Sequence, residues 1–219
     1  MKTIVVTSQK GGSGKTMLCT HLAVEAERQG DGPVWLIDTD KQGTLSLWHE
    51  RREAETPQRA DVSFVQLAGG LALLGKRGAA FCLVDTPPAI SEQTAAVIEL
   101  ADLVVIPVRP SPADLWSVSQ TVELTRQARR SFLFVITQAK AQANITAQTV
   151  AALSHHGRVA QTFIADRVPY AAAMTDGHSA AELALRSPCA QEIAGLWADV
   201  KACFHENLKA TKPRSRANA

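Results

Sequence analysis

Short apolar runs alternate along this chain with longer segments whose apolar residues recur every three or four positions. The apolar runs are rich in β-branched residues and predict strands at 3–7, 34–37, 62–65, 80–84, 103–108 and 132–136. The longer segments predict helices near 15–29, 42–55, 90–100, 113–130 and 145–155. Nearly continuous apolar strands are typical of a sheet covered on both faces. Because strands and helices alternate, the pattern predicts an α/β chain with a mostly parallel, twisted sheet flanked by helices.

A last helix is predicted from residue 188 onward, with Ser187 as its cap and Pro188 in its first turn. One face is apolar at helical spacing, which favours packing on the sheet over lying on a membrane. The other face mixes acidic and basic residues, so it is not the basic face of a typical membrane-surface helix. The apolar positions are Ile193, Leu196, Trp197, Val200, Cys203, Phe204 and Leu208.

The 219 residues suit one α/β domain, which we place at 1–208. Residues 209–219 contain four basic and no acidic residues, although the whole chain has a formal net charge of only +2. This short polar segment is predicted to be a disordered basic tail. It could contact nucleic acid or an acidic membrane, or serve only as a solubilising end.

The cysteines form no Cys-x-x-Cys pair and indicate small buried residues in a reducing compartment. The first strand begins at residue 2 without the design of a signal peptide, and no apolar stretch approaches 18 residues. We therefore expect a cytoplasmic protein. The four cysteines are Cys19, Cys82, Cys189 and Cys203.

A glycine-rich loop lies between the first strand and the first helix, in the sequence Lys-Gly-Gly-Ser-Gly-Lys-Thr. Glycines let backbone N–H groups approach phosphate oxygens, and the helix N-terminus adds a positive field. Lys15 is placed to reach the β- and γ-phosphates of a nucleotide, and the Thr16 hydroxyl to bind Mg²⁺. The dinucleotide pattern is excluded because Met17 stands where it needs Gly or Ala. The loop predicts a single-domain P-loop NTPase, with nucleotide contacts from Lys10, Gly11, Gly12, Ser13, Gly14, Lys15, Thr16 and Met17.

Carboxylates follow two of the predicted strands. Asp38 and Asp40 come after 34–37, and Asp85 comes after 80–84. Because ligands bind at the carboxyl ends of strands in such sheets, these groups should lie beside the phosphate loop. A single carboxylate there could instead cap the next helix, but two of them beside a P-loop favour catalysis.

Lys10, together with the loop glycines, Lys15 and Thr16, resembles the deviant Walker A motif of the ParA/MinD family. Residues 38–43 are similar to that family's switch I, residues 85–88 to its switch II, and residues 108–114 to a Pro-Ser-Pro segment of small ParA proteins. The resemblance extends over residues 2–205. It departs at Met17, where a second hydroxyl is common, and at Lys41, where a proline is common.

The resemblance implies an ATPase that uses Mg²⁺ and forms a homodimer on binding ATP. Lys10 would reach the partner's nucleotide, Asp40 would position the attacking water, and Asp38 and Asp85 would lie near the metal with Thr16. By position, the segments 137–138 and 168–170, the latter including Tyr170, are expected near adenine. The resemblance also implies non-specific double-stranded DNA as a partner, a ParB-like or adaptor protein that stimulates hydrolysis, and association with the nucleoid.

A large ParA protein carries an N-terminal DNA-reading domain, which the early first strand leads us not to expect here. The cargo would be a plasmid, a chromosome region or a protein assembly. Two alternatives stay open: a MinD-like membrane-associated positioning ATPase, and a metabolic relative such as an amidoligase or a metal-cluster carrier. The candidate phosphate-contacting residues on DNA are Arg126, Arg129, Arg130, Lys201, Lys209, Lys212, Arg214 and Arg216.

Overall fold

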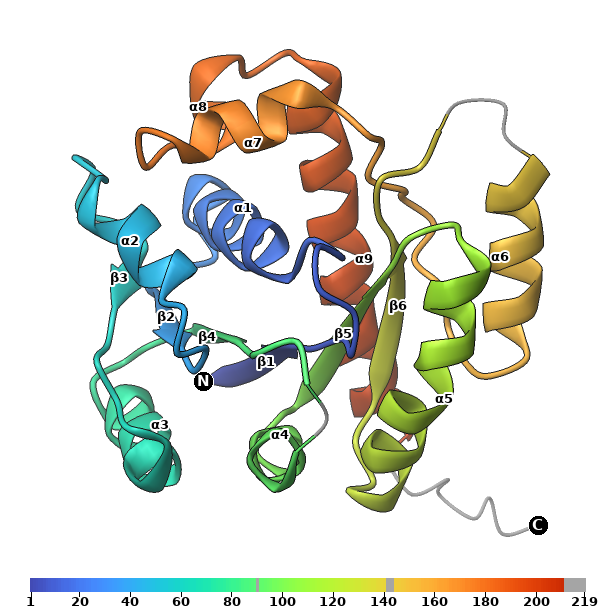
Figure 1. Ribbon diagram of the computed structural model, residues 1–219. Helices are drawn as coiled ribbons and strands as arrows, with labels where there is room; N and C mark the ends of the chain where they lie inside the picture. The colour runs from blue at the N-terminus through green and yellow to red at the C-terminus, as the bar shows by residue number, and fades with distance from the viewer. Residues whose placement is uncertain (90, 141–143, 211–219) are drawn as a thin grey trace, which may run out of the picture.

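The computed structural model describes residues 1–89, 91–140 and 144–210 and shows one sheet between two layers of helices (Figure 1). Within these residues, six parallel strands lie in the order β3-β2-β4-β1-β5-β6. The predicted α/β fold is therefore confirmed. The strands are β1 Lys2–Val6, β2 Val34–Asp38, β3 Gln58–Arg59, β4 Phe81–Asp85, β5 Leu103–Val108 and β6 Phe132–Ile136.

The helices cover both faces of the sheet. One layer consists of α1 Lys15–Arg28, α2 Thr44–Glu50, α7 Val168–Met174, α8 Ala180–Leu183 and α9 Pro188–Ala210. The other consists of α3 Leu67–Lys76, α4 Glu92–Glu99, α5 Pro112–Gln127 and α6 Asn144–Ser154, with the short 3-10 helix η1 Phe64–Gln66 before α3.

Successive side chains of β1 point alternately to the two faces of the sheet and so pack into both hydrophobic cores. Ile4 and Val6 point into the core under α1 and α9, whereas Val5 points into the core above α3 to α5. All three are fully buried. Burial on both faces explains why the strands read as nearly continuous apolar runs.

The strand predicted at 62–65 is wrong. The edge strand is β3, two polar residues that pair with Trp35 and Leu36 of β2 through the backbone, and Phe64–Gln66 is the 3-10 helix. Val65 is 92% exposed, so the apolar run at this point does not mark a buried element. An edge strand this short needs no apolar signal, because backbone pairing on one side holds it.

The helix predicted at 42–55 is also too long, because α2 ends at Glu50. Beyond it the chain turns, and the Arg52 guanidinium donates a hydrogen bond to the carbonyl of Thr56. The other predicted helices agree with the structure to within about three residues at each end.

Helix α9 confirms the prediction for the last helix. Ser187 Oγ accepts a hydrogen bond from the N–H of Ala190 at 3.2 Å, and the predicted apolar positions from Ile193 to Phe204 are buried. All four cysteines are also buried. The helix continues to Ala210, past the boundary predicted at 208, and places Lys209 in its last turn. Lys212, Arg214 and Arg216 lie outside the described residues.

Candidate nucleotide site

The phosphate loop connects β1 to α1 at the carboxyl edge of the sheet (Figure 1). Gly12 and Gly14 have φ angles of 71° and 93°, a left-handed conformation that residues with a side chain rarely adopt. Gly14 is also the N-cap of α1, where no described side chain caps the helix. The first N–H groups of α1 are therefore directed at the loop, where a phosphate would accept from them.

The ends of β1 and β6 hold this loop in place. The Thr137 hydroxyl donates to the carbonyl of Ser13 at 2.8 Å, and the Gln138 amide donates to the carbonyl of Gly12 at 2.7 Å. The Ser8 hydroxyl donates to Ser13 Oγ at 3.0 Å. Thr137 and Gln138, predicted near adenine, therefore also support the loop that would bind the phosphates.

Two lysines lie at the loop and differ in their surroundings. Lys15 is 7% exposed, and its ammonium donates to the carbonyl of Lys10 at 3.3 Å. Burial lowers the pKa of Lys15, while attraction to Asp85 and Asp40 acts in the opposite direction. The Lys10 ammonium makes no hydrogen bond or ion pair with any described residue. A buried lysine inside the loop and an uncommitted one at its entrance fit the roles expected of Lys15 and Lys10.

Asp85, at the end of β4, is nearly fully buried below the loop. Its Oδ2 accepts from the Thr16 hydroxyl at 2.5 Å, while its Oδ1 is buried without a hydrogen-bond partner among the described residues. The pKa of Asp85 is raised to about 7, chiefly by burial and also by the charges of Asp38 and Asp40, against the opposing effects of the Thr16 hydrogen bond and the Lys15 charge. This carboxylate lacks the partners that a permanent buried charge requires.

The arrangement fits Mg²⁺. An unpartnered carboxylate oxygen lies next to a hydroxyl, and both are the hard oxygen ligands that this ion prefers. No group of three or more His, Cys, Asp or Glu residues suited to a metal occurs in the described parts of the chain. Mg²⁺ does not need one, because it usually keeps waters and takes substrate phosphates as further ligands.

Asp38 and Asp40 build the loop that follows β2. The Asp38 carboxylate accepts from the N–H of Asp40 at 3.0 Å and from the N–H and hydroxyl of Ser46 at 2.9 and 3.0 Å. Asp40 Oδ1 accepts from the N–H of Gln42 at 3.0 Å. The Thr39 hydroxyl donates to the carbonyl of Asp85 at 2.6 Å, which ties this loop to the end of β4. The capping role considered for a strand-end carboxylate is thus the one that Asp38 takes, and its metal role stays a prediction.

Tyr170, in the segment expected near adenine, points into the core, so the placement of residues 168–170 near adenine stays a prediction. It is 5% exposed and packs edge-on against His21 of α1, with ring centroids 5.4 Å apart. Its hydroxyl donates to Glu192 of α9 at 2.7 Å. An aromatic ring with a polar tip usually finds such a partner when buried, and here that partner is in the core. Val168, two residues earlier, is 81% exposed and could still contact a base.

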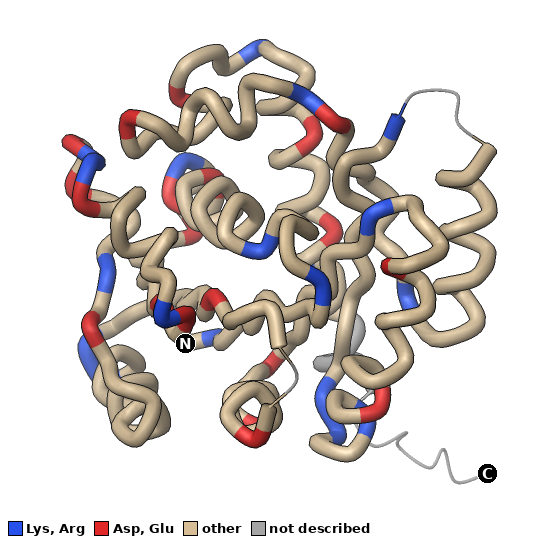
Figure 2. The backbone as a smooth tube through the Cα atoms, in the orientation of Figure 1, with Lys and Arg blue, Asp and Glu red and all other residues tan. Residues whose placement is uncertain are grey.

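The predicted DNA contacts fall into two groups. Arg126, Arg129 and Arg130 are exposed where α5 ends and β6 begins, and Figure 2 shows basic segments gathered there. Arg126 and Arg130 each donate to a backbone carbonyl, of His156 and Glu99 respectively. Lys201 lies on α9 and forms an ion pair with Asp31 at 2.8 Å, so part of its charge is compensated.

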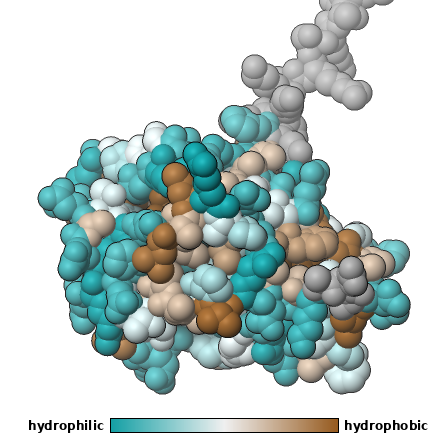
Figure 3. Space-filling model, turned by 90° about the horizontal axis from the view of Figure 1, so that it is seen from above, coloured by the Kyte–Doolittle hydropathy of each residue, from teal (hydrophilic) through white to brown (hydrophobic). Residues whose placement is uncertain are grey.

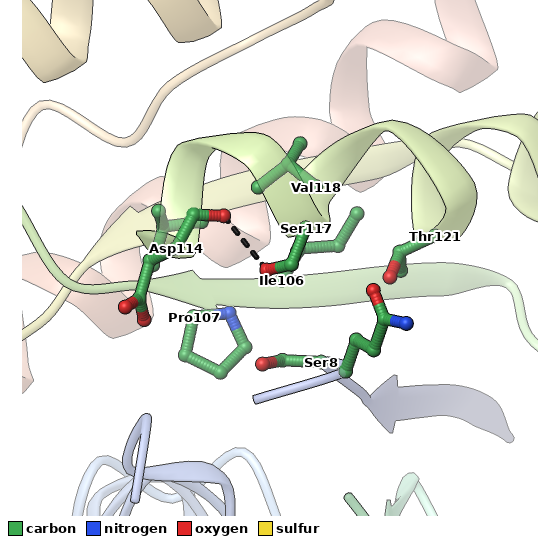
Figure 4. A pocket seen from close by; sticks show the side chains of 9 residues that line it. Ser8, Ile106, Pro107, Asp114, Ser117, Val118 and Thr121 are labelled. Atoms are coloured by element: carbon green, nitrogen blue, oxygen red, sulfur yellow. Dashed lines mark hydrogen bonds between the residues drawn. The ribbon is translucent and has the colours of Figure 1, made fainter. Parts of the chain in front are cut away.

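Sequence reasoning missed Arg109 as a candidate for this site. It follows β5, and its guanidinium forms a two-pronged ion pair with Asp114 of α5. Figure 4 shows the corner between β5 and α5, where the Ser117 hydroxyl donates to the carbonyl of Asp114. The pocket there is about 10 Å³, which is room for about one water. The signal that could have found Arg109 is its place at a strand's carboxyl end.

Comparison with known proteins agrees with this geometry. The CobQ/CobB/MinD/ParA nucleotide binding domain family matches residues 4–180. The Maintenance of carboxysome distribution protein A of Halothiobacillus neapolitanus is 28% identical over 199 residues, which cover 87% of this chain and 91% of that protein.

Two solved structures share the fold. A Cyanothece McdA variant in complex with ATP superposes with a TM-score of 0.78 at 20% identity, covering 93% of this chain and 96% of that one. MinD of Pyrococcus horikoshii in complex with Mg-ADP gives a TM-score of 0.76 at 16% identity, covering 96% and 99%. The chain belongs to the CobQ/CobB/MinD/ParA nucleotide binding domain family and is a nucleotide-binding ATPase of the ParA/MinD type.

Proposed function

We propose that this ATPase forms a dimer that encloses two ATP molecules, binds double-stranded DNA without sequence preference, and positions a cargo. Hydrolysis, stimulated by a ParB-like or adaptor protein, releases the DNA. Mg²⁺ is the metal, held by Thr16 and Asp85 with Asp38 nearby. Lys15 and Asp40 serve hydrolysis within one subunit, and the protein acts in the cytoplasm on the nucleoid.

The proposal of a dimer rests on the Lys10 ammonium, which has no hydrogen-bond or ion-pair partner among the described residues. Lys15 already occupies the inside of the loop and uses the carbonyl of Lys10 as its acceptor. A second cation at the entrance has no partner among the described residues of its own chain. A nucleotide held by a second copy, with charge concentrated on its terminal phosphate, is the partner of matching chemistry.

The DNA-binding part of the proposal rests on charge. Arg126, Arg129 and Arg130 are exposed, and the partners of Arg126 and Arg130 among the described residues are neutral backbone carbonyls rather than carboxylates. We propose that these three arginines contact DNA phosphates, with Lys201, Lys209 and Lys212 as further contacts. Binding that relies on phosphates needs no base-reading element and ignores sequence. Dimerisation would double the number of arginines that face one duplex.

The membrane alternative gains no support from α9. The apolar face of this helix packs on the sheet, and Ile193, Leu196 and Trp197 are at most 1% exposed. Figure 3 shows that apolar residues on the face seen from above form patches interrupted by polar ones. None of the described helices has the length and apolarity that crossing a bilayer requires.

The names of two relatives indicate a class of cargo. The relative from Halothiobacillus neapolitanus is named for carboxysome distribution, and a relative in Rhizobium radiobacter is named ParA. We propose that the cargo is a plasmid, a chromosome region or a large protein assembly that carries its own adaptor. The adaptor would act on the ATP-bound dimer.

The test is DNA affinity for two unrelated duplexes across a salt series, with ATP and with ADP. We expect tight binding only with ATP, equal affinity for both duplexes, and a fall with salt of about 0.9 in log K per neutralised phosphate. The Lys10→Ala variant should bind ADP normally but fail to elute as a dimer with a non-hydrolysable ATP analogue. Tight binding in ADP, preference for one duplex, or binding only to anionic liposomes would contradict the proposal.

A further inference from the structure

Arg109 is held beside the phosphate loop by a two-pronged ion pair with Asp114, which we call the fork. Its Nε donates to Asp114 Oδ1 at 2.9 Å and its Nη2 donates to Asp114 Oδ2 at 3.1 Å. Asp114 is 3% exposed and also accepts from the Ser111 hydroxyl at 2.6 Å. A planar two-pronged pair of this kind fixes the direction of the guanidinium.

The third nitrogen of that guanidinium faces the loop. A Cβ atom built on Gly12 would lie 3.6 Å from Arg109 Nη1. Nη1 makes no hydrogen bond with any described residue, so its two N–H donors are unused. Gly12 is exposed and its carbonyl is taken by Gln138. The donors therefore lie at the mouth of the phosphate loop, where a bound nucleotide would be exposed.

The fork is not required to start α5. The Ser111 hydroxyl already accepts from the N–H of Asp114 as the helix cap, and Pro112 fits the first turn. A buried ion pair is also weak evidence for stability, because desolvation offsets its attraction. The specific consequence of the fork is where it puts the remaining positive charge.

We propose that Arg109 binds the terminal phosphate of ATP in its own subunit and stabilises the charge on that phosphate during hydrolysis. The inference rests on the nucleotide site described above. In the reaction, a water oxygen bonds to the γ-phosphorus, and the bond from that phosphorus to the oxygen bridging the β- and γ-phosphates breaks. The bonding pair stays with ADP, and one proton of the water remains on the phosphate while the other passes to solvent. A fixed cation acts on the charge that spreads over the γ-phosphate oxygens.

The test compares Arg109→Gln with Arg77→Gln, an exposed arginine at the end of α3 that lies on another part of the chain. We expect Arg109→Gln to lower kcat at least about 10-fold and to lower the affinity for a non-hydrolysable ATP analogue, while ADP affinity stays within about twofold of the parent. Arg109→Lys should rescue only part of the loss, because an ammonium cannot keep the fork and reach the phosphate together. Asp114→Asn should give a smaller loss of the same kind. Arg77→Gln should change none of these values.

Equal losses of ADP and analogue affinity in Arg109→Gln would show a merely structural role and overturn the inference, as would an unchanged kcat. A parent protein that binds neither nucleotide would instead contradict the phosphate site itself. The analogue-to-ADP ratio needs no turnover, so it tests Arg109 even if hydrolysis by the parent is slow.

An experiment with mixed subunits decides whether Arg109 acts on the ATP of its own subunit or on the ATP of the partner subunit. In mixtures of Arg109→Gln with Asp40→Ala, an arginine that acts within its own subunit restores no activity, because each subunit then lacks one group of its own site. Activity recovered in the mixture would show that Arg109 serves the partner's nucleotide and would overturn the assignment made here.

Discussion

Asp38 and Asp85 stand side by side at the ends of β2 and β4, paired in register, yet their surroundings differ. Asp38 accepts three hydrogen bonds from the loop and helix that follow it. The Asp85 carboxylate accepts one from the described residues, from the Thr16 hydroxyl, and its other oxygen is buried without a described partner. Asp38 thus fixes the fold of the loop that follows it, whereas the ligand role of Asp85 stays a prediction that its unpartnered oxygen supports.

The chain after each strand explains the difference. After Asp38, residues 39–43 curl back so that N–H groups of the loop and of α2 reach its carboxylate. After Asp85 come Thr86, Pro87 and Pro88, and the Thr86 hydroxyl donates away from Asp85, to the carbonyl of Val6. Since proline has no N–H, this segment cannot satisfy Asp85 as the first segment satisfies Asp38.

The largest effect is expected at Lys15, where a substitution should abolish ligand binding without disturbing the fold. Lys15→Ala removes the cation inside the loop that would contact the β- and γ-phosphates. We expect nucleotide binding to be lost, with the circular dichroism spectrum unchanged. Calorimetric titration with ADP checks this, and Lys76→Ala, an exposed lysine on α3, is the control. Normal binding by Lys15→Ala would contradict the site.

Asp40→Ala should separate binding from chemistry. The groups expected to hold phosphate and metal remain, so ATP affinity should stay within a few-fold of the parent. Hydrolysis should slow by orders of magnitude, because it depends on the positioning of water. A phosphate-release assay at saturating ATP gives the rate, and equal rates in variant and parent would remove Asp40 from the mechanism.

His21 tests whether an unpartnered buried atom always marks a ligand site. Its Nε2 is buried without a described partner, as Asp85 Oδ1 is, but it packs against Tyr170 in the core. Burial lowers the pKa of His21 to about 4. Between about pH 6.5 and 4 the unfolded chain binds a proton that the folded chain excludes, so stability falls as the pH falls through this range, by up to about 3 kcal/mol.

The measurement is the free energy of unfolding against pH for the parent and for His21→Gln. The variant should show a shallower loss between pH 6.5 and 4, while His205→Gln, at an exposed position of α9, should keep the parent's slope. Identical slopes in His21→Gln and the parent would mean that His21 is protonated in the fold. A change in ADP affinity would place His21 at the ligand, against the present account.

Asp38→Asn gives the smallest effect, on stability. An asparagine has one acceptor oxygen, so its NH₂ group would face N–H donors that now bind the carboxylate. We expect a loss of about 1–2 kcal/mol, measured by urea unfolding. Asp61→Asn is the matched control, since that side chain is 78% exposed and its ion pair with Arg59 lies at the surface. A loss no larger than that of the control would show that the three hydrogen bonds to Asp38 do not support the fold.

Features encoded in short contiguous segments were predictable from the sequence. The phosphate loop, both strand-end carboxylates and five of the strands follow from local residue order. The edge strand β3 and the short helices α7 and α8 were missed, because a two-residue strand or a four-residue helix carries too little periodicity. Helix α3 was missed because two adjacent glycines weaken its helical pattern, although Leu67, Leu71 and Leu74 are buried on one side.

Contacts between distant segments were not predictable. Gln138 reaches the loop across 126 residues of sequence, and Tyr170 turns into the core because Glu192 lies there to accept its hydroxyl. Asp38 fixes the loop because the chain folds back and the N–H of Ser46 donates to its carboxylate. In each case tertiary packing, which local residue order does not contain, decides between two roles that the residue type allows.

The most direct test of the contrast between the two carboxylates is the Mg²⁺ dependence of nucleotide affinity in Asp85→Asn and in Asp38→Asn. ADP binding is titrated by calorimetry with Mg²⁺ and with a chelator, at a temperature where both variants are folded. We predict that Asp85→Asn loses most of the gain that Mg²⁺ gives the parent, whereas Asp38→Asn keeps it. Loss of the gain in Asp38→Asn with its retention in Asp85→Asn would contradict the account.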